Sequence, residues 1–239
     1  MSYIPNSAQV LVLLVAGLLV VGLPAEAQDV RWSVSLGGTA SSFHGNASNF
    51  AQTGFVGQQL PSNFASYRTG VHVRGGFDVL LTRRFGIQAE AAYAQAGGIL
   101  ERERVGPADG PLDERITFKL DDLSFPVLAT FRIPSLELGV RPELFAGPAL
   151  NVRLRSTAAI EGRSFDSRLD YNRTSDVAGP TVHVAGIVGA AFAYPLASGR
   201  EVALDVRYRY SQSRVGIQDA QAQPQMSTIN VGLRFTFGL

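Results

Sequence analysis

The chain has 239 residues, with 21 Arg and Lys against 20 Asp and Glu, and it contains no cysteine. A formal net charge of +1 argues against a nucleic-acid partner, which needs a concentrated basic face. The lack of cysteine excludes a disulfide scaffold, so an exported chain of this kind must be held by backbone hydrogen bonds and side-chain packing.

The N-terminal segment predicts export. Residues 10–23 form a continuous apolar run, and Ala25-Glu26-Ala27 follows as a small-x-small site that suits a signal peptidase. A retained anchor is the alternative, although this run is short for a bilayer span of about 20 residues. We therefore expect a signal peptide at residues 1–27 and a mature domain at residues 28–239.

Eight segments of the mature chain alternate apolar and polar residues with a period of two, which predicts amphipathic β-strands. In chain order they are residues 31–40, 69–82, 85–95, 123–132, 138–154, 181–194, 202–210 and 228–239. Long polar stretches, which we interpret as loops, alternate with short turns; the long ones are 41–68, 96–115, 155–176 and 211–226. Alternating long and short connections are typical of a barrel whose strands cross a membrane.

Two segments complicate this pattern. Residues 177–196 carry no formal charge, so hydropathy alone would also allow a transmembrane helix. Pro180, several glycines and many β-branched residues favour a strand instead. Pro126 lacks a backbone donor, so we expect it at a bulge or at a locally unpaired position of its strand.

Charged residues collect on the face opposite the apolar one. An Arg or Lys on the apolar face would cost about 2–4 kcal/mol at the midplane of a bilayer. When the strands close into a small barrel, the charged face turns inward. The charges must then pair with one another, because side chains fill the interior of a barrel of this size. The predicted lumen charge network comprises Arg74, Asp78, Glu90, Arg132, Arg141, Glu143, Arg153, Asp205, Arg207, Arg209 and Arg234, with Arg31 and Glu201 beside them. Its excess of Arg would be offset by loop acids, waters or a bound anion.

Aromatic residues lie near the ends of the predicted strands, as expected for girdles at the two membrane interfaces. One rim would hold Trp32, Phe85, Phe131, Phe192, Tyr194, Phe235 and Phe237. The opposite rim would hold Tyr93, Tyr208 and Tyr210.

The last segment carries a polar-x-Gly-x-x-hydrophobic-x-aromatic pattern, formed by Asn230, Gly232, Phe235 and Phe237. It resembles the terminal strand by which bacterial outer-membrane barrels are recognised for assembly, although Gly238 and Leu239 follow the last aromatic residue. The resemblance implies that the barrel-assembly machinery is a partner of this chain.

Residues 123–128 (LSFPVL) and 144–148 (LFAGP), with the terminal strand, resemble the PorT-like outer-membrane β-barrel family, within the group of small barrels that includes OmpX and the OmpA barrel. The resemblance implies the bacterial outer membrane, and some relatives take part in protein secretion or adhesion. We predict an all-β fold: an eight-stranded antiparallel up-and-down transmembrane β-barrel. Outer-membrane lipid would surround it, and a protein partner would bind its external loops.

We predict no catalytic, cofactor-binding or metal site. Such a site needs several histidines, or one histidine with a serine and a carboxylate, to converge. His72 and His183 both face the predicted lumen, where hydrogen bonding accounts for them more simply. A barrel enzyme acting on lipid or peptide and a narrow passive channel remain alternatives, whereas a soluble lipocalin-like barrel would need an apolar interior.

Overall fold

The computed structural model describes residues 30–44, 65–106, 110–135, 139–164, 171–176, 181–196, 199–211 and 225–238. These ranges contain ten strands. They are β1 (Val30–His44), β2 (Ala65–Ser66), β3 (Arg68–Leu80), β4 (Phe85–Gly106), β5 (Gly110–Arg132), β6 (Arg141–Ser164), β7 (Tyr171–Asp176), β8 (Val182–Pro195), β9 (Glu201–Ser211) and β10 (Gln225–Gly238). The predicted signal peptide lies outside the described residues.

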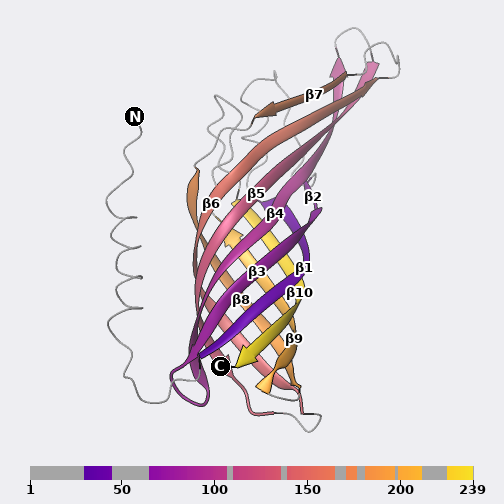
Figure 1. The fold of residues 1–239 in the computed structure, drawn as a ribbon. Coiled ribbons are helices and arrows are strands. Elements are labelled where there is room, and N and C mark those ends of the chain that lie inside the picture. The colour runs from indigo at the N-terminus through magenta and orange to yellow at the C-terminus, as the bar shows by residue number, and fades with distance from the viewer. Residues whose placement is uncertain are drawn as a thin grey trace, which may run out of the picture.

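Eight of the strands close into an antiparallel barrel in the order β1-β3-β4-β5-β6-β8-β9-β10 (Figure 1). The closing pair, β1 with β10, runs in one register from Arg31↔Gly238 to His44↔Gln225. The short strands β2 and β7 pair with β4 and β6 respectively. The eight-stranded antiparallel barrel predicted from the sequence is therefore confirmed.

The two segments that complicated the sequence pattern are both strands. The helix alternative for residues 177–196 is wrong, because β8 occupies most of that segment. Among the described residues, no helix has the length and hydrophobicity needed to span a bilayer. On β5, the ladder to β4 passes from Ala89↔Val127 to Ala92↔Ser124 without a pair at Pro126, while Pro126 still faces Ala149 on β6.

Three strands are much longer than predicted. The stretches 96–115 and 155–176, which we expected to be loops, are mostly strand, because β4, β5 and β6 span 22, 23 and 24 residues. Figure 1 shows these strands rising well beyond the ends of the others, with β7 at their far end. Smaller corrections apply to β1, which continues to His44, and to β10, which begins at Gln225. The remainder of the predicted loops at 45–64 and 212–224 lies outside the described residues.

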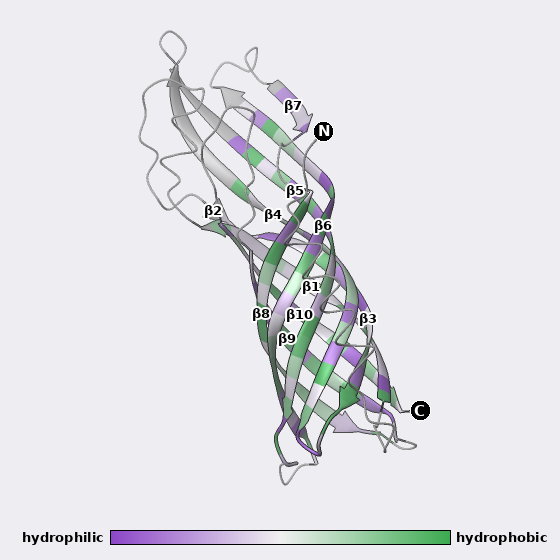
Figure 2. Cartoon of the chain, turned by 90° about the vertical axis from the view of Figure 1, so that its left-hand side faces the viewer, coloured by the Kyte–Doolittle hydropathy of each residue, from purple (hydrophilic) through white to green (hydrophobic). Residues whose placement is uncertain are grey.

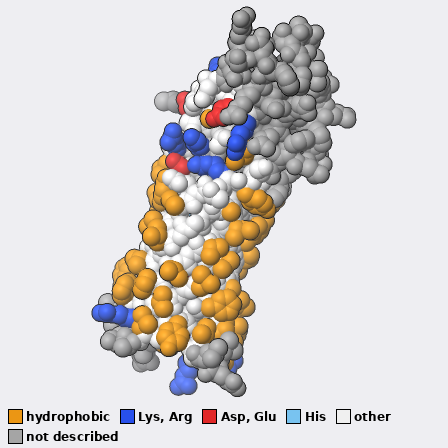
Figure 3. Space-filling view, turned by 90° about the vertical axis from the view of Figure 1, so that its right-hand side faces the viewer, with side chains coloured by type: hydrophobic (Ala, Val, Ile, Leu, Met, Phe, Trp, Pro, Cys, Tyr) orange, Lys and Arg blue, Asp and Glu red, His pale blue; other side chains and the backbone are white. Residues whose placement is uncertain are grey.

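The lower part of the barrel is apolar outside and polar inside. Its outward side chains include Leu36, 64% exposed, and Leu233, 53% exposed, whereas Arg74 and Asp205 are buried within. Figure 2 shows apolar residues along β8, β9 and β10, and Figure 3 shows hydrophobic side chains spread over the lower part of one outer face. This arrangement excludes the soluble lipocalin-like barrel, which would bury apolar residues and expose polar ones.

The polarity of β5 inverts near its middle. From Arg115 to Phe131 the odd-numbered residues face outward, but below Asp121 they are apolar, as at Phe125, and above it they are polar, as at the exposed Lys119. The inward residues change the opposite way, from Ser124 to the fully buried Phe118. The β5–β6 register shifts by one residue at this level, where Leu154 of β6 has no cross-strand partner. The extension formed by the upper parts of β4, β5 and β6 thus has the face pattern of a sheet in water.

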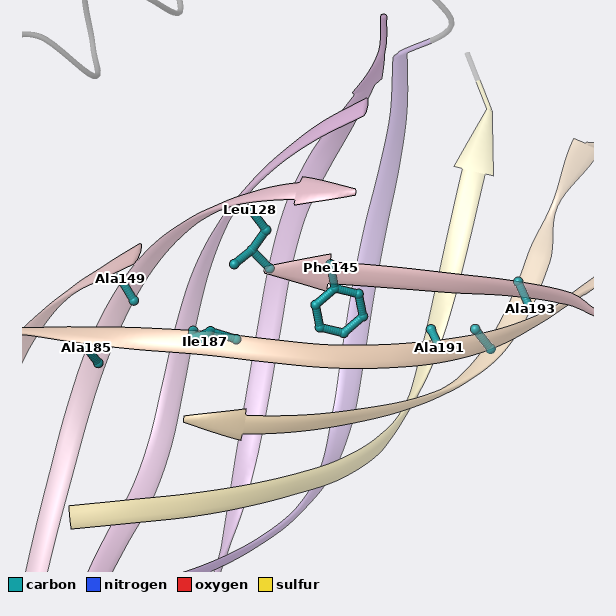
Figure 4. Packing of buried hydrophobic residues seen from close by; sticks show 8 residues of the cluster. Leu128, Phe145, Ala149, Ala185, Ile187, Ala191 and Ala193 are labelled. Atoms are coloured by element: carbon teal, nitrogen blue, oxygen red, sulfur yellow. The ribbon is translucent and has the colours of Figure 1, made fainter. Parts of the chain in front are cut away.

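Two apolar clusters lie in the interior. The upper cluster lies at the base of the extension and contains Phe43, Ala96, Ile116, Phe118, Leu120, Ala158, Ile160 and Met226. The rings of Phe43 and Phe118 meet edge to face, with their centroids 5.3 Å apart. The lower cluster lies inside the barrel against β8 and contains Leu128, Phe145, Ala149, Ala185, Ile187, Ala191, Ala193 and Ala203 (Figure 4).

Phe145 shows why β8 needs a glycine inside the barrel. A Cβ atom at Gly189 would overlap the Phe145 ring, so only glycine leaves room for it. The guanidinium carbon of Arg207 lies 4.6 Å from the centroid of the same ring, a cation–π contact. The Ala- and Gly-rich inner face of β8, for which we predicted no role, forms an apolar wall of the lumen.

Candidate functional site

The middle of the lumen holds a balanced group of two arginines and two carboxylates. Arg207 donates to Glu90 at 2.5 Å and to Asp205 at 2.9 Å, and all three side chains are buried. Arg74 contacts Asp205 at 3.0 Å and donates to the hydroxyl of Ser35 at 2.9 Å. These contacts join β1, β3, β4 and β9 across the interior.

The lower end of the lumen holds a larger group, formed by Arg31, Asp78, Arg132, Arg141, Glu143, Glu201 and Arg234. Glu143 lies between Arg132, 3.0 Å away at Nε, and Arg234, which donates to its other oxygen. Glu201 accepts a hydrogen bond from Arg31 at 2.8 Å and another from Arg141. The group connects the strand ends next to the short turns.

The upper group is organised around Asp122, a residue that the sequence analysis missed. This fully buried carboxylate contacts Arg153 at 3.1 Å, Arg209 at 3.5 Å and His183 at 3.8 Å. Arg209 also donates to the side-chain oxygen of Asn151 at 3.4 Å. Asp122 lay just outside the segment predicted as a strand. Asp122 is two residues from the inward Ser124, so it lies on the same face of the strand, and this spacing could have placed it inside.

Every arginine that we expected in the lumen contacts a carboxylate. Eight arginines (Arg31, Arg74, Arg132, Arg141, Arg153, Arg207, Arg209 and Arg234) share six carboxylates (Asp78, Glu90, Asp122, Glu143, Glu201 and Asp205). The arginines therefore exceed the carboxylates by two. The sequence predicted an excess of three, and the number is smaller because Asp122 joins the network. The network and the two apolar clusters share the interior of the barrel.

The two lumen histidines have structural contacts. A Cβ atom built at Gly37 would lie 2.6 Å from Cε1 of His72, and one at Gly232 would lie 2.9 Å from its Nε2. The imidazole therefore occupies the space left by this cross-strand glycine pair, and its Nδ1 lies 3.2 Å from the carbonyl oxygen of Gly38. His183 belongs to the Asp122 group instead. Within the described ranges, no three His, Cys, Asp or Glu side chains are arranged to hold a metal ion.

The aromatic residues named from the sequence occupy both ends of the apolar band. At the lower end, Trp32 is paired in register with Phe237, and its ring lies 5.8 Å from that of Phe77. The Phe85 and Phe131 rings are 4.9 Å apart. Exposed side chains at this end also include Phe192, Tyr194 and Phe235. Toward the upper end, Tyr208 is exposed, and Tyr93 and Tyr210 are half-buried on the same outer surface.

The terminal pattern lies on β10. Phe235 and Phe237 are exposed on the outer surface, and Phe235 pairs with Val34 of β1 and Val202 of β9. Gly232 lies against His72, and Asn230 faces the interior. These four residues therefore occupy both faces of the strand that closes the barrel.

A family model described as "Outer membrane protein beta-barrel domain" matches residues 26–239. The chain belongs to this family. It is a protein of the bacterial outer membrane. By the rule for such barrels, the short turns lie in the periplasm and the extension of β4–β6 lies outside the cell.

The solved structures that resemble this one include several small outer-membrane proteins. OprG of Pseudomonas aeruginosa is 10% identical, with 89% of this chain and 98% of that chain covered and a TM-score of 0.47. The Neisserial surface protein A is 12% identical, with 89% and 100% covered and a TM-score of 0.44. Ail of Yersinia pestis is 16% identical, with 87% and 99% covered and a TM-score of 0.37. No curated protein matches the chain.

Proposed function

We propose that this protein acts by binding a partner with its extracellular extension, in a structural, adhesive or secretion-related role of the kind that the PorT-like resemblance implies. The contrast between its two parts carries this proposal. Ion pairs and apolar side chains line the lumen, whereas β4, β5 and β6 continue far above the apolar band. In this proposal the ion pairs and apolar side chains close the lumen, so the outer surface is the part of the molecule that other molecules can reach.

The proposal is tested by shortening the extension. Replacing residues 101–115 by Asn-Gly keeps the Leu100↔Ile116 pair and supplies a favourable two-residue hairpin turn. The shortened barrel should insert into the outer membrane and migrate heat-modifiably like the full chain. It should fail to recover the protein partner that affinity purification from solubilised membranes yields with the full chain. Undiminished recovery would contradict the proposal.

The two alternatives from the sequence predict different results. A narrow channel would conduct in planar bilayers, and we expect no conductance because each of the eight lumen arginines contacts a carboxylate inside the barrel. A barrel enzyme that uses the lumen histidines would lose its activity when His72 and His183 are both replaced by Gln. We expect partner recovery to be unchanged in that variant, provided that heat-modifiable migration shows that it folds.

The predicted signal peptide and the assembly role of the terminal strand belong to the same proposal. Mass determination of the barrel purified from the outer membrane should give a chain that starts at Gln28. An intact N-terminus would indicate a retained anchor instead.

A further inference from the structure

The outer surface of the extension carries three cations close together. Lys119 and Arg155 are exposed on β5 and β6. Arg68 lies across β4, where it donates to the carbonyl oxygen of Ala96 and where a Cβ atom built at Gly97 would lie 3.2 Å from its Cδ. Gly97 is in register with Lys119, so these side chains converge on one stretch of surface. In Figure 3, Lys and Arg side chains gather just above the hydrophobic band.

The height of this cluster matches the headgroup layer of a membrane. Arg155 is in register with Asp121, two residues above the lipid-facing Leu123, and Lys119 is four residues above it. Four residues cover about 13 Å along a strand. For a strand tilt of 35–45°, that is about 10 Å along the membrane normal. The headgroup layer extends about 5–8 Å beyond the hydrocarbon, and a long Lys side chain can reach down into it.

Carboxylates lie close to the cluster, and Asp121 attracts Arg68. Asp121 faces Arg155 across the ladder, and Asp176 faces Thr157, the partner of Lys119. Among the residues that the structure describes, no carboxylate lies within ion-pair distance of Lys119 or Arg155. Three cations against two carboxylates leave the surface positive at the level where the outer leaflet presents its phosphate groups.

We propose that Arg68, Lys119 and Arg155 form a binding site for the phosphate groups of the outer-leaflet glycolipid. The two guanidinium groups can bind phosphate oxygens through paired N–H donors, and the ammonium group adds a mobile point charge. The site lies on the β4–β6 side of the barrel. It fixes how deeply the chain sits in the membrane and which side of it gathers phosphorylated lipid.

The single lysine of the chain makes a direct test available. The mature chain is placed in phosphatidylethanolamine vesicles under three conditions. The first vesicles contain diphosphoryl lipid A, and the second contain its dephosphorylated form. The third contain no lipid A, and inorganic phosphate is added to the buffer. The rate at which an amine-reactive reagent acylates Lys119 is then followed by peptide mass spectrometry. We expect protection of about fivefold or more with diphosphoryl lipid A alone, as the attraction of one cation to an anionic surface implies. Equal rates in the first two vesicles would overturn the proposal, and equal protection by inorganic phosphate would replace the lipid with the free anion.

Variants with matched charge loss provide the second measurement. Lys119→Gln with Arg155→Gln should reduce the lipid A phosphate that copurifies with the barrel, by about fivefold for each charge removed. Arg83→Gln with Arg84→Gln removes the same charge from an exposed turn at the opposite rim and should leave the phosphate content unchanged. Equal losses in both variants would show a non-specific charge effect and would overturn the proposed site. Heat-modifiable migration confirms that each variant folds.

Discussion

The barrel and its extension share the strands β4, β5 and β6, but their outward faces differ. The outward residues are apolar in the barrel and polar in the extension. On β5, Phe125 faces outward in the barrel and Lys119 faces outward in the extension, with no change in which residues point out. Their inward neighbours differ as well: Ser124 lines the lumen, whereas Phe118 is buried in the upper cluster. The surroundings change and the strand geometry does not.

This difference shows where the solvent changes from lipid to water. In a bilayer the outward side chains are apolar, and polar groups pair inside the barrel. In water a sheet buries its apolar face and exposes its polar one. The inversion between Asp121 and Asp122, beside the register shift at Leu154, therefore marks the outer boundary of the hydrocarbon core on this side of the barrel.

Removing the end of the closing strand should have the largest effect on the barrel. Deleting residues 235–239 removes the Phe235↔Val34 pair and the terminal aromatic residues, so the lower ends of β1 and β9 lose the strand that joins them. We expect no assembled protein in the outer-membrane fraction and no heat-modifiable band. Normal assembly of the truncated chain would show that the barrel does not depend on this strand end.

The next largest effect should come from the lumen. Asp205→Asn leaves the buried Arg74 and Arg207 without one of their carboxylates. Breaking a buried ion pair on one side costs about 3–5 kcal/mol. The free energy of unfolding, measured in urea with the barrel in lipid vesicles, should fall by that amount. Asp176→Asn, at an exposed position of the extension, should leave it unchanged.

A pair of arginine substitutions on one face of β5 tests the inversion itself. Val127→Arg places a cation on the lipid-facing surface and should cost about 2–4 kcal/mol near the midplane. Thr117→Arg adds the same side chain to the same face ten residues higher, where water is outside, and should change stability by at most about 0.5 kcal/mol. Both are measured by urea unfolding in vesicles. Equal costs would mean that the two parts of β5 share one solvent.

The barrel was predictable because its signal is local. Alternation with apolar residues outward defined the lipid-facing part of each strand, including Val34 on β1 and Leu233 on β10. The extension was missed because its alternation continues with the opposite polarity. Ile116, Phe118 and Leu120 are apolar at even positions, where the barrel part of β5 has polar residues. An expectation of apolar residues at odd positions therefore ended the strand too early.

Pairing inside the lumen could be predicted in kind but not in detail. Inward charges must find partners, so the residue types followed from the strand faces. Which carboxylate serves which arginine depends on strand tilt and on side-chain reach across the interior, as when Arg207 contacts Glu90 from another wall. The apolar wall of β8 was also beyond the sequence, because only the Phe145 ring reveals why Gly189 lies beside it.

The position of the membrane surface on β5 is measured most directly by spin labels at single cysteines. The chain has no cysteine, so each variant from residue 115 to residue 131 carries one label. In lipid vesicles, labels at the odd positions 123–131 should be accessible to oxygen. Labels at the odd positions 115–121 should be accessible to a water-soluble nickel complex. Labels at positions 116, 118 and 120 should be shielded from both. Oxygen accessibility at positions 117 and 119 would contradict an inversion at Asp121–Asp122.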